Sequence, residues 1–349
     1  MRHKFSLLHV PAAILFLVIT SCSSEAIKVS DMPIKVQLDT LVQFMDFDMH
    51  GIAQPGDIAL LENGDVVVAD GKIKKITIVD PEGNLLAQFG KEGKGPAEFI
   101  RPGQIMLTSD YINVVDASQY KVLEYDYEGS FVDSYTYKSK AFNQNIALTN
   151  NRVYYTGSGG ENNSLIKFID INTDSSFLFG SAKGEAVENL DMEASRNDFM
   201  NGRIPAFFKN NTNVVIGNNH IYAFLDSYSE LRKYDMNGNL IWDKIIELPD
   251  NEQLLNQISD MVKSTPNALP FLRYTLDIKP VNEDIYLLGG KTFDNPQHLT
   301  KIDSNGEIRA IYQMPNPDYY FGSFAVNPIN QTIYLSSVDG MVYKGKLNE

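Results

Sequence analysis

A short strand-like segment recurs six times along this chain, and no other feature constrains its fold as strongly. Each copy is rich in β-branched, aliphatic and aromatic residues, which favour strands. The copies are DVVVAD at 65–70, YINVVD at 111–116, RVYYTG at 152–157, HIYAFL at 220–225, DIYLLG at 284–289 and TIYLSS at 332–337. Repeats of this kind are typical of solenoids, propellers and arrays.

A tight turn follows five of these segments after about 14–18 residues. The turns read DPEGN at 80–84, DYEGS at 126–130, DINTD at 170–174, DMNGN at 235–239 and DSNGE at 303–307. Asp accepts backbone N–H bonds at the start of such a turn, and Gly supplies the positive φ of the reversal. We therefore expect a hairpin in each unit, with positive φ at Gly83, Gly129, Gly238 and Gly306.

One unit contains roughly four strands in about 45 residues, which is the size of a propeller blade. The chain is therefore predicted to be an all-β, six-bladed β-propeller. Residues 181–209 and 249–274 are insertions that widen two of the spacings. The last unit ends one strand early, and an open blade would expose a strand edge. We expect the strand-like residues 34–41 to close the ring beside the C-terminal strand near 341–347.

The second insertion has the pattern of a helix. Its apolar residues follow helical spacing, and Asp250 and Asn251 are candidates for its N-terminal cap. The apolar positions are Leu254, Leu255, Ile258, Met261 and Val262. We expect one amphipathic helix over a face of the propeller, ended by Pro266 and Pro270.

The N-terminus has the features of a secretory signal peptide. Arg2 and Lys4 precede an apolar run from about Val10 to Ile19, which is too short to span a membrane. Ile19-Thr20-Ser21-Cys22 then resembles the lipobox of bacterial lipoproteins. In that family the Cys is acylated and the peptide is cut just before it. Cys22 is the only cysteine, so a disulfide cannot explain it.

These features predict three segments: a lipoprotein signal peptide at 1–21, a tether at 22–33 and the propeller at 34–349. Without Arg2 and Lys4 the net charge changes from −14 to −16. Such acidity disfavours nucleic acid and anionic headgroups, so the lipid on Cys22 is the expected membrane attachment. We expect the cell envelope as the location, at a bacterial membrane and by preference the outer one.

The stretch QFGKEGKGPAEFIRPGQI at 88–105 resembles the linker between blades of NHL-type propellers. The matching residues are Phe89, Gly90, Gly93, Gly95, Pro96, Phe99 and Pro102. The chain is thus similar to bacterial six-bladed propeller lipoproteins related to NHL repeats. The resemblance implies a scaffold that binds partners, although lactonase-like propellers hold a divalent ion in the central channel.

Metal and catalytic motifs are weak in this sequence. His50, His220 and His298 are far apart, and no Gly-x-Ser-x-Gly motif occurs. Asp57, Asn145 and Asn213 near the inner-strand starts leave an oxygen-only calcium site open, but nothing fixes them as a set. We predict no catalytic residues, no metal ligands and no cofactor.

Aromatic residues with an arginine on loops have the composition of an interface. Arg203, Phe207 and Phe208 in the first insertion, with Tyr319 and Tyr320 before the last unit, are the predicted ligand-binding residues. They could equally cap the propeller core. We favour a non-enzymatic binding module for a protein, peptide or glycan of the envelope. A lactonase- or lyase-type hydrolytic enzyme with a metal at the channel mouth is the alternative.

Overall fold

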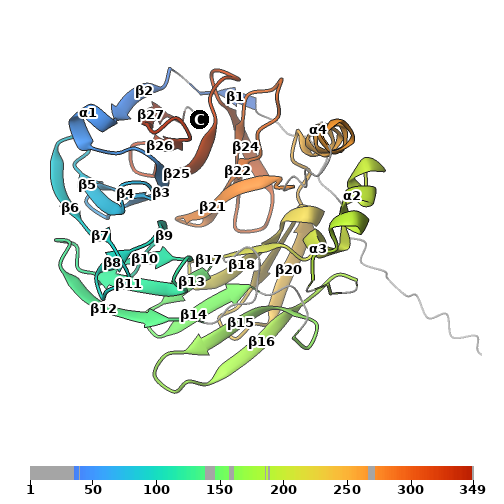
Figure 1. Cartoon of the computed structure of the whole chain (residues 1–349), viewed down its shortest axis with the longest axis horizontal. Coiled ribbons are helices and arrows are strands. Elements are labelled where there is room, and N and C mark those ends of the chain that lie inside the picture. The colour runs from blue at the N-terminus through green and yellow to red at the C-terminus, as the bar shows by residue number, and fades with distance from the viewer. Residues whose placement is uncertain are drawn as a thin grey trace, which may run out of the picture.

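The chain folds into a ring of six antiparallel sheets (Figure 1). The computed structural model describes residues 35–38, 40–137, 146–156, 161–184, 186–187, 189–265 and 272–347. The signal peptide, Cys22 and the tether expected over 22–33 lie outside these residues, as do Pro266 and Pro270. The six-bladed all-β prediction is confirmed.

Blades one to three follow the repeat in chain order, with the innermost strand first. Their strands are β3 (Pro55–Leu60), β4 (Val66–Asp70), β5 (Lys75–Val79) and β6 (Leu85–Phe89); β9 (Pro102–Leu107), β10 (Ile112–Asp116), β11 (Lys121–Tyr125) and β12 (Phe131–Thr136); and β13 (Ile146–Thr149), β14 (Arg152–Thr156), β15 (Ser164–Asp170) and β16 (Ser176–Ser181). A small parallel pair, β7 (Lys91–Glu92) and β8 (Glu98–Phe99), lies in the linker between the first two blades.

Blades four to six have the same order from the axis outwards. Their strands are β17 (Thr212–Gly217), β18 (His220–Leu225), β19 (Glu230–Tyr234) and β20 (Leu240–Ile245); β21 (Thr275–Val281), β22 (Asp284–Gly289), β23 (His298–Ile302) and β24 (Ile308–Gln313); and β25 (Phe321–Asn327), β26 (Thr332–Ser337) and β27 (Val342–Lys346). The described helices are α1 (Phe47–His50), α2 (Met192–Met200), α3 (Ala206–Lys209), α4 (Asn251–Ser264) and the 3-10 helix η2 (Asp226–Tyr228).

An N-terminal strand closes the ring, but it is not the whole segment expected at 34–41. β2 (Val42–Met45) pairs antiparallel with β27 as the outer strand of blade six. β1 (Lys35–Gln37) instead pairs parallel with β24 and adds a fifth strand to blade five. Between them, Leu38 and Leu41 are buried in the core that blades five and six share. Their burial bends the chain away from β24, so only the residues after Leu41 reach β27.

The direction of the strands determines on which face of the ring each connection between strands lies. Four antiparallel strands bring the chain back to the face at which it entered, so each link from an outer strand to the next inner strand lies on that face. Both insertions are such links, and α2 and α4 pack side by side (Figure 1). We call this the helix face. The turns between each inner strand and the second strand lie on the opposite face, which we call the turn face.

The predicted turns have the expected geometry. Asp80 Oδ1 accepts hydrogen bonds from the backbone N–H groups of Glu82 at 3.0 Å and Asn84 at 2.7 Å. Asp126, Asp235 and Asp303 repeat this arrangement. The four predicted glycines all have positive φ, between 81° and 95°. In the third unit, Asp174 adopts φ 53° in place of the glycine.

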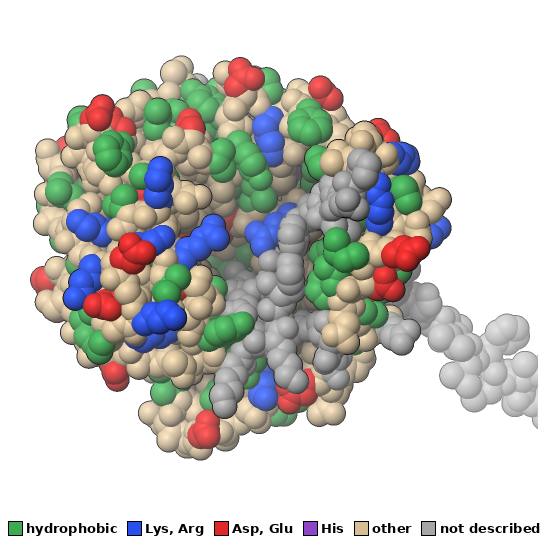
Figure 2. Space-filling model, viewed as in Figure 1, with side chains coloured by type: hydrophobic (Ala, Val, Ile, Leu, Met, Phe, Trp, Pro, Cys, Tyr) green, Lys and Arg blue, Asp and Glu red, His purple; other side chains and the backbone are tan. Residues whose placement is uncertain are grey.

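Both insertions fold onto the core that blades four and five share. The expected helix is α4, while the first insertion, expected to be a loop, also contains α2 and α3. Phe199 and Phe208 from the first insertion share one core with Ile258 and Val262 of α4 and with Leu231 of β19. None of the described helices is long and apolar enough to cross a membrane. Acidic and basic side chains are interspersed over the face seen in Figure 2.

Candidate functional site

A central cavity of about 530 Å³ lies where the inner strands of all six blades converge. Its wall comes from β3, β9, β13, β17, β21 and β25. Each of these strands is the innermost of its sheet, so its second edge faces the ring axis without a strand partner. The volume is within the range of pockets that bind small ligands, about 300–1,000 Å³.

The cavity reaches the turn face of the ring. Glu62, Asn282 and the segment Asn327–Ile329 line it and belong to turns that follow inner strands. At this rim Ile329 is 89% exposed. The cavity mouth and the two insertions are therefore on opposite faces.

Most residues of the wall are apolar, although polar atoms contribute about as much of its exposed surface as apolar ones do. Strand side chains alternate between the two faces of a sheet, so residues at equivalent positions lie on the same side of their blades. The strand registers place Ala59, Met106, Ala147, Val215 and Ala325 at equivalent positions, and all five line the cavity. Blade five has Lys279 at this position. One cation therefore enters an otherwise apolar layer.

Polar side chains two residues earlier join several blades to the next. Asp57 Oδ2 of β3 accepts from the backbone N–H of Ile105 in β9 at 2.7 Å. Gln104 Oε1 accepts from the N–H of Ile146 in β13 at 3.3 Å. Asp277 of β21 makes the corresponding bond to blade six, where it accepts from the N–H of Phe324 at 3.2 Å. This polar layer satisfies backbone groups on the inner edges, which would be costly to bury without partners.

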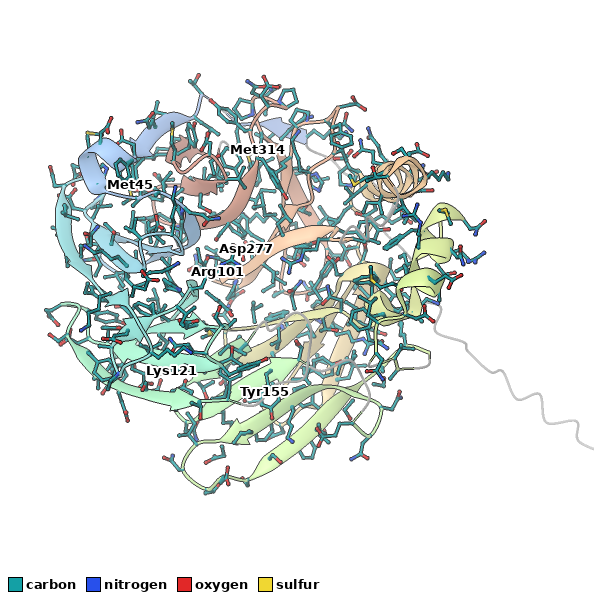
Figure 3. All side chains as sticks on the ribbon, viewed as in Figure 1. Met45, Arg101, Lys121, Tyr155, Asp277 and Met314 are labelled. Carbon is teal, nitrogen blue, oxygen red and sulfur yellow. The ribbon has the colours of Figure 1, made fainter. Side chains whose placement is uncertain are left out.

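Four of these side chains form a charged cluster at the inner end of the cavity, which we call the floor cluster: Asp57, Asp277, Lys279 and Ser323. Lys279 Nζ donates to Asp57 Oδ1 at 2.6 Å and to the carbonyl oxygen of Ile58, and lies 3.5 Å from Asp277 Oδ2. Ser323 Oγ is 2.5 Å from Asp57 Oδ1 and 2.7 Å from Asp277 Oδ2. The cluster links blades five, six and one near the ring axis, where Figure 3 labels Asp277.

Burial changes the acid–base properties of this cluster. It raises the pKa of Asp277; the negative charge of Asp57 adds to the rise, while Lys279 opposes it. Burial alone would lower the pKa of Lys279. The neighbouring Asp277 and Asp57 side chains outweigh that effect, so the pKa of Lys279 is raised and the amine stays charged.

The predicted binding residues of the first insertion lie on the helix face, away from this cavity. Arg203 is exposed and pairs with Asp198 of α2, with Nη2 2.9 Å from Oδ1. Phe208 is only 5% exposed, and Phe207 is partly buried against the same core. The two rings of α3 pack edge to face, with centroids 5.2 Å apart. Most of this aromatic surface is therefore engaged inside the chain.

Tyr319 and Tyr320 lie on another link of the helix face, between β24 and β25. Tyr319 packs against Phe321 and Tyr343, with ring centroids 5.4 Å and 5.1 Å away. Tyr320 is 39% exposed. Only Tyr320 and Arg203 among the five predicted residues thus offer a large part of their side chains to a partner on this face.

The sequence of residues 48–237 matches the family described as DUF5128, a 6-bladed beta-propeller. This match covers more than half of the chain. The chain belongs to this family. No curated protein matches it in sequence.

Solved structures resemble this DUF5128 propeller in fold. One is a member of the DUF4221 family from Bacteroides vulgatus ATCC 8482, with TM-score 0.58, 10% identity, and coverage of 90% of this chain and 98% of that one. A protein of Bacteroides fragilis NCTC 9343 described as exported has TM-score 0.55, 12% identity and coverage of 90% and 98%. Virginiamycin B lyase from Staphylococcus aureus, in complex with quinupristin and in a catalytically inactive His→Ala form, has TM-score 0.51, 12% identity and coverage of 88% and 99%. At such identities these likenesses concern the fold alone.

The floor cluster of this DUF5128 propeller was not predicted from the sequence. Of the three residues considered for calcium, Asp57 belongs to the cluster, Asn213 does not line the cavity and Asn145 lies outside the described residues. Across the described part of the chain, no group of three or more His, Cys, Asp and Glu side chains is placed to hold a metal ion. A signal for the cluster does exist. A polar residue lies two positions before the equivalent wall position of the inner strand at Asp57, Gln104, Asp277 and Ser323.

Proposed function

We propose that this chain is an exported, membrane-anchored binding module that holds its ligand in the central cavity. One observation carries the proposal. The cavity has the volume of a ligand pocket, most of its lining residues are apolar, and a cluster of charged groups converges at one end, as is usual for a binding pocket. The partner is a molecule of the cell envelope, or a part of a protein, peptide or glycan there that fits this volume.

Export and anchoring rest on the N-terminal sequence. The basic start, the apolar run and the lipobox-like segment before Cys22 support secretion followed by acylation. The fold likeness to a protein described as exported agrees with this proposal. A lipid on Cys22 would hold the propeller at a membrane, for which we favour the outer one.

A hydrolytic enzyme of lactonase or lyase type is the second candidate. The raised pKa of Asp277 beside a cavity favours it, because such groups cluster at catalytic sites. The virginiamycin B lyase form with one histidine replaced by alanine is catalytically inactive. In this chain His50, His220 and His298 are all absent from the cavity wall. The binding function is therefore the better supported one.

Native mass spectrometry tests the binding proposal. The purified propeller is mixed with the small-molecule fraction of a bacterial envelope extract, and masses retained on the folded protein are measured. Ala59 faces the cavity and Ala194 of α2 is exposed, so Ala59→Phe fills the cavity while Ala194→Phe is its matched control. We expect the wild type and Ala194→Phe to retain the same added mass and Ala59→Phe to lose it.

The proposal fails if no molecule is retained, or if Ala59→Phe retains it as well as the wild type does. Circular dichroism of both variants is the control that checks whether they remain folded. A retained molecule that is released with altered mass would instead support the enzyme.

A further inference from the structure

The hydrogen bonds of the floor cluster require one proton more than its hydroxyl group provides. Ser323 Oγ lies within hydrogen-bond distance of two carboxylates, those of Asp57 and Asp277. A serine hydroxyl has a single proton and can donate to only one of them. The second short contact therefore needs a proton on a carboxyl group, which then donates to Ser323.

Asp277 is the residue that carries this proton. Each of the two carboxyl groups accepts from two backbone N–H groups, Asp57 from Ile58 and Ile105 and Asp277 from Ile278 and Phe324. The Lys279 ammonium distinguishes them, because it lies 2.6 Å from Asp57 but 3.5 Å from Asp277, so the negative charge of Asp57 is the better matched one. Burial favours the neutral form of Asp277, consistent with its raised pKa. The groups that face Asp277 are Asp57 from β3, Lys279 and the Ile278 N–H from its own strand, and Ser323 and the Phe324 N–H from β25. The cluster is thus neutral in total, with Asp57 negative, Lys279 positive and Asp277 protonated.

This arrangement leaves no hydrogen-bond donor of the cluster for a ligand. The three protons of the Lys279 ammonium face Asp57, Asp277 and the carbonyl oxygen of Ile58. The proton of Asp277 is engaged by Ser323. An anionic ligand would meet carboxyl groups at the floor and Glu62 at the mouth. A cation would find hydrogen-bond acceptors there. Its positive charge would also replace that of the proton which Asp277 loses.

We propose that the cavity binds a protonated amine carried on an apolar stem, and that its ammonium group replaces the proton of Asp277. This inference rests on the proposed function, because it names the chemistry of the ligand for the same cavity. The stem packs against Ala59, Met106 and Val215, and the ammonium group reaches the floor cluster. The displaced proton goes to solvent. A free alkylamine and a lysine side chain of a peptide share this chemistry.

Isothermal titration calorimetry with three six-carbon probes tests the chemistry of the head group. The probes are n-hexylamine, hexanoate and hexanol, which share a stem and differ in charge. We expect hexylamine to bind at least about tenfold more tightly than the other two, since only it compensates the carboxylate charge. Titrations in two buffers of different ionisation enthalpy should show the release of one proton. At pH values below the pKa of Asp277, the affinity for hexylamine should then increase with pH, by up to about tenfold per pH unit.

Two variants make the test specific. Asp277→Asn keeps the shape of the neutral side chain and is expected to fold, but to lose proton release and at least about tenfold in hexylamine affinity. Glu193→Gln removes an exposed carboxylate of α2 on the helix face, away from the cavity, and its affinity should stay within about threefold of the wild type. Nα-acetyl-lysine amide distinguishes the two sources. Tighter binding of this compound than of hexylamine indicates a lysine side chain, and the reverse indicates a free amine.

The inference is wrong if hexanoate or hexanol binds as tightly as hexylamine, if no proton is released, or if Asp277→Asn binds hexylamine like the wild type. It is also wrong if no amine binds, although the wild type retains an envelope molecule that Ala59→Phe does not retain. In those cases the cavity remains a binding site for another chemistry. If no envelope molecule is retained either, the proposed function fails with it.

Discussion

Two turn glycines of the same geometry should differ in how much stability depends on them. Gly83 and Gly129 have φ of 95° and 89°, in turns that begin with Asp80 and Asp126. Alanine at either position costs about 1 kcal/mol, because a Cβ is disfavoured in the left-handed region. The surroundings differ. A Cβ on Gly83 would lie 3.6 Å from Phe44, an ordinary contact, whereas one on Gly129 would lie 2.4 Å from the ring of Phe89.

The Phe89 ring cannot simply move away, because it packs against Tyr125 with centroids 4.6 Å apart. Forcing extra atoms into such a contact costs about 1–3 kcal/mol more. We therefore expect Gly129→Ala to lower the free energy of unfolding by about 2–4 kcal/mol and Gly83→Ala by about 1 kcal/mol.

Urea denaturation with unchanged m-values measures this difference. Phe89→Leu combined with Gly129→Ala should recover part of the loss, since the smaller side chain relieves the clash. Equal losses for the two glycines, or strictly additive effects in the double variant, would refute the reasoning.

Three further predictions concern the anchor, a buried acid and the helix face. Cys22→Ser should abolish incorporation of a fatty-acid probe in metabolic labelling, and unchanged labelling would exclude acylation at this residue. Burial raises the pKa of Asp226 to about 7 although the N–H groups of Tyr274 and Thr275 donate to it. A raised folded-state pKa means that stability is lost as pH rises from about 4 to 7, by at most about 4 kcal/mol at 1.36 kcal/mol per unit. Asp226→Asn should flatten that dependence in urea titrations at each pH, and an unchanged slope would contradict it. Arg196 of α2 donates to carbonyl oxygens at the C-terminal end of α4. Arg196→Ala should therefore speed hydrogen exchange in α4 and lower the free energy of unfolding by about 1–3 kcal/mol. Arg203→Ala is the control and should lower it by less than about 1 kcal/mol, because it removes only a surface ion pair.

The blade architecture could be predicted because every blade repeats the same local requirements. Asp80 and Gly83 make their turn with residues close in sequence, and Val66 is buried because the faces of neighbouring blades pack against each other. The ring closure could be predicted only in outline. Leu38 and Leu41 look like continuations of a strand, and only the packing of two neighbouring blades shows that they bend the chain.

The helices of the first insertion could not be predicted because their apolar content is low. Within α2 the residues MEASRNDFM bury mainly Phe199 and Ser195, so no apolar stripe is evident in the sequence. The helix is instead fixed by Asp191, which caps it by accepting from the N–H of Ala194, and by packing against α4.

The floor cluster could not be predicted because its members are distant in sequence. Asp57 and Ser323 meet only when the last blade closes against the first, and Lys279 reaches them from blade five. Each of these polar residues, taken by itself, looks like an ordinary solvent-exposed residue near the end of a strand. Aligning the inner strands identifies the polar layer, but not the exchange of hydrogen bonds within it.

Methyl NMR with labelled methionine tests most directly whether ligands bind in the central cavity. Met106 lines the cavity, and Met261 of α4 is 37% exposed on the helix face. Met45 in the core serves as an internal reference. On addition of the envelope small-molecule fraction, we predict that the Met106 methyl resonance shifts while those of Met261 and Met45 stay unchanged. A shift of Met261 with Met106 unaffected would contradict the account and place the binding surface on the helix face.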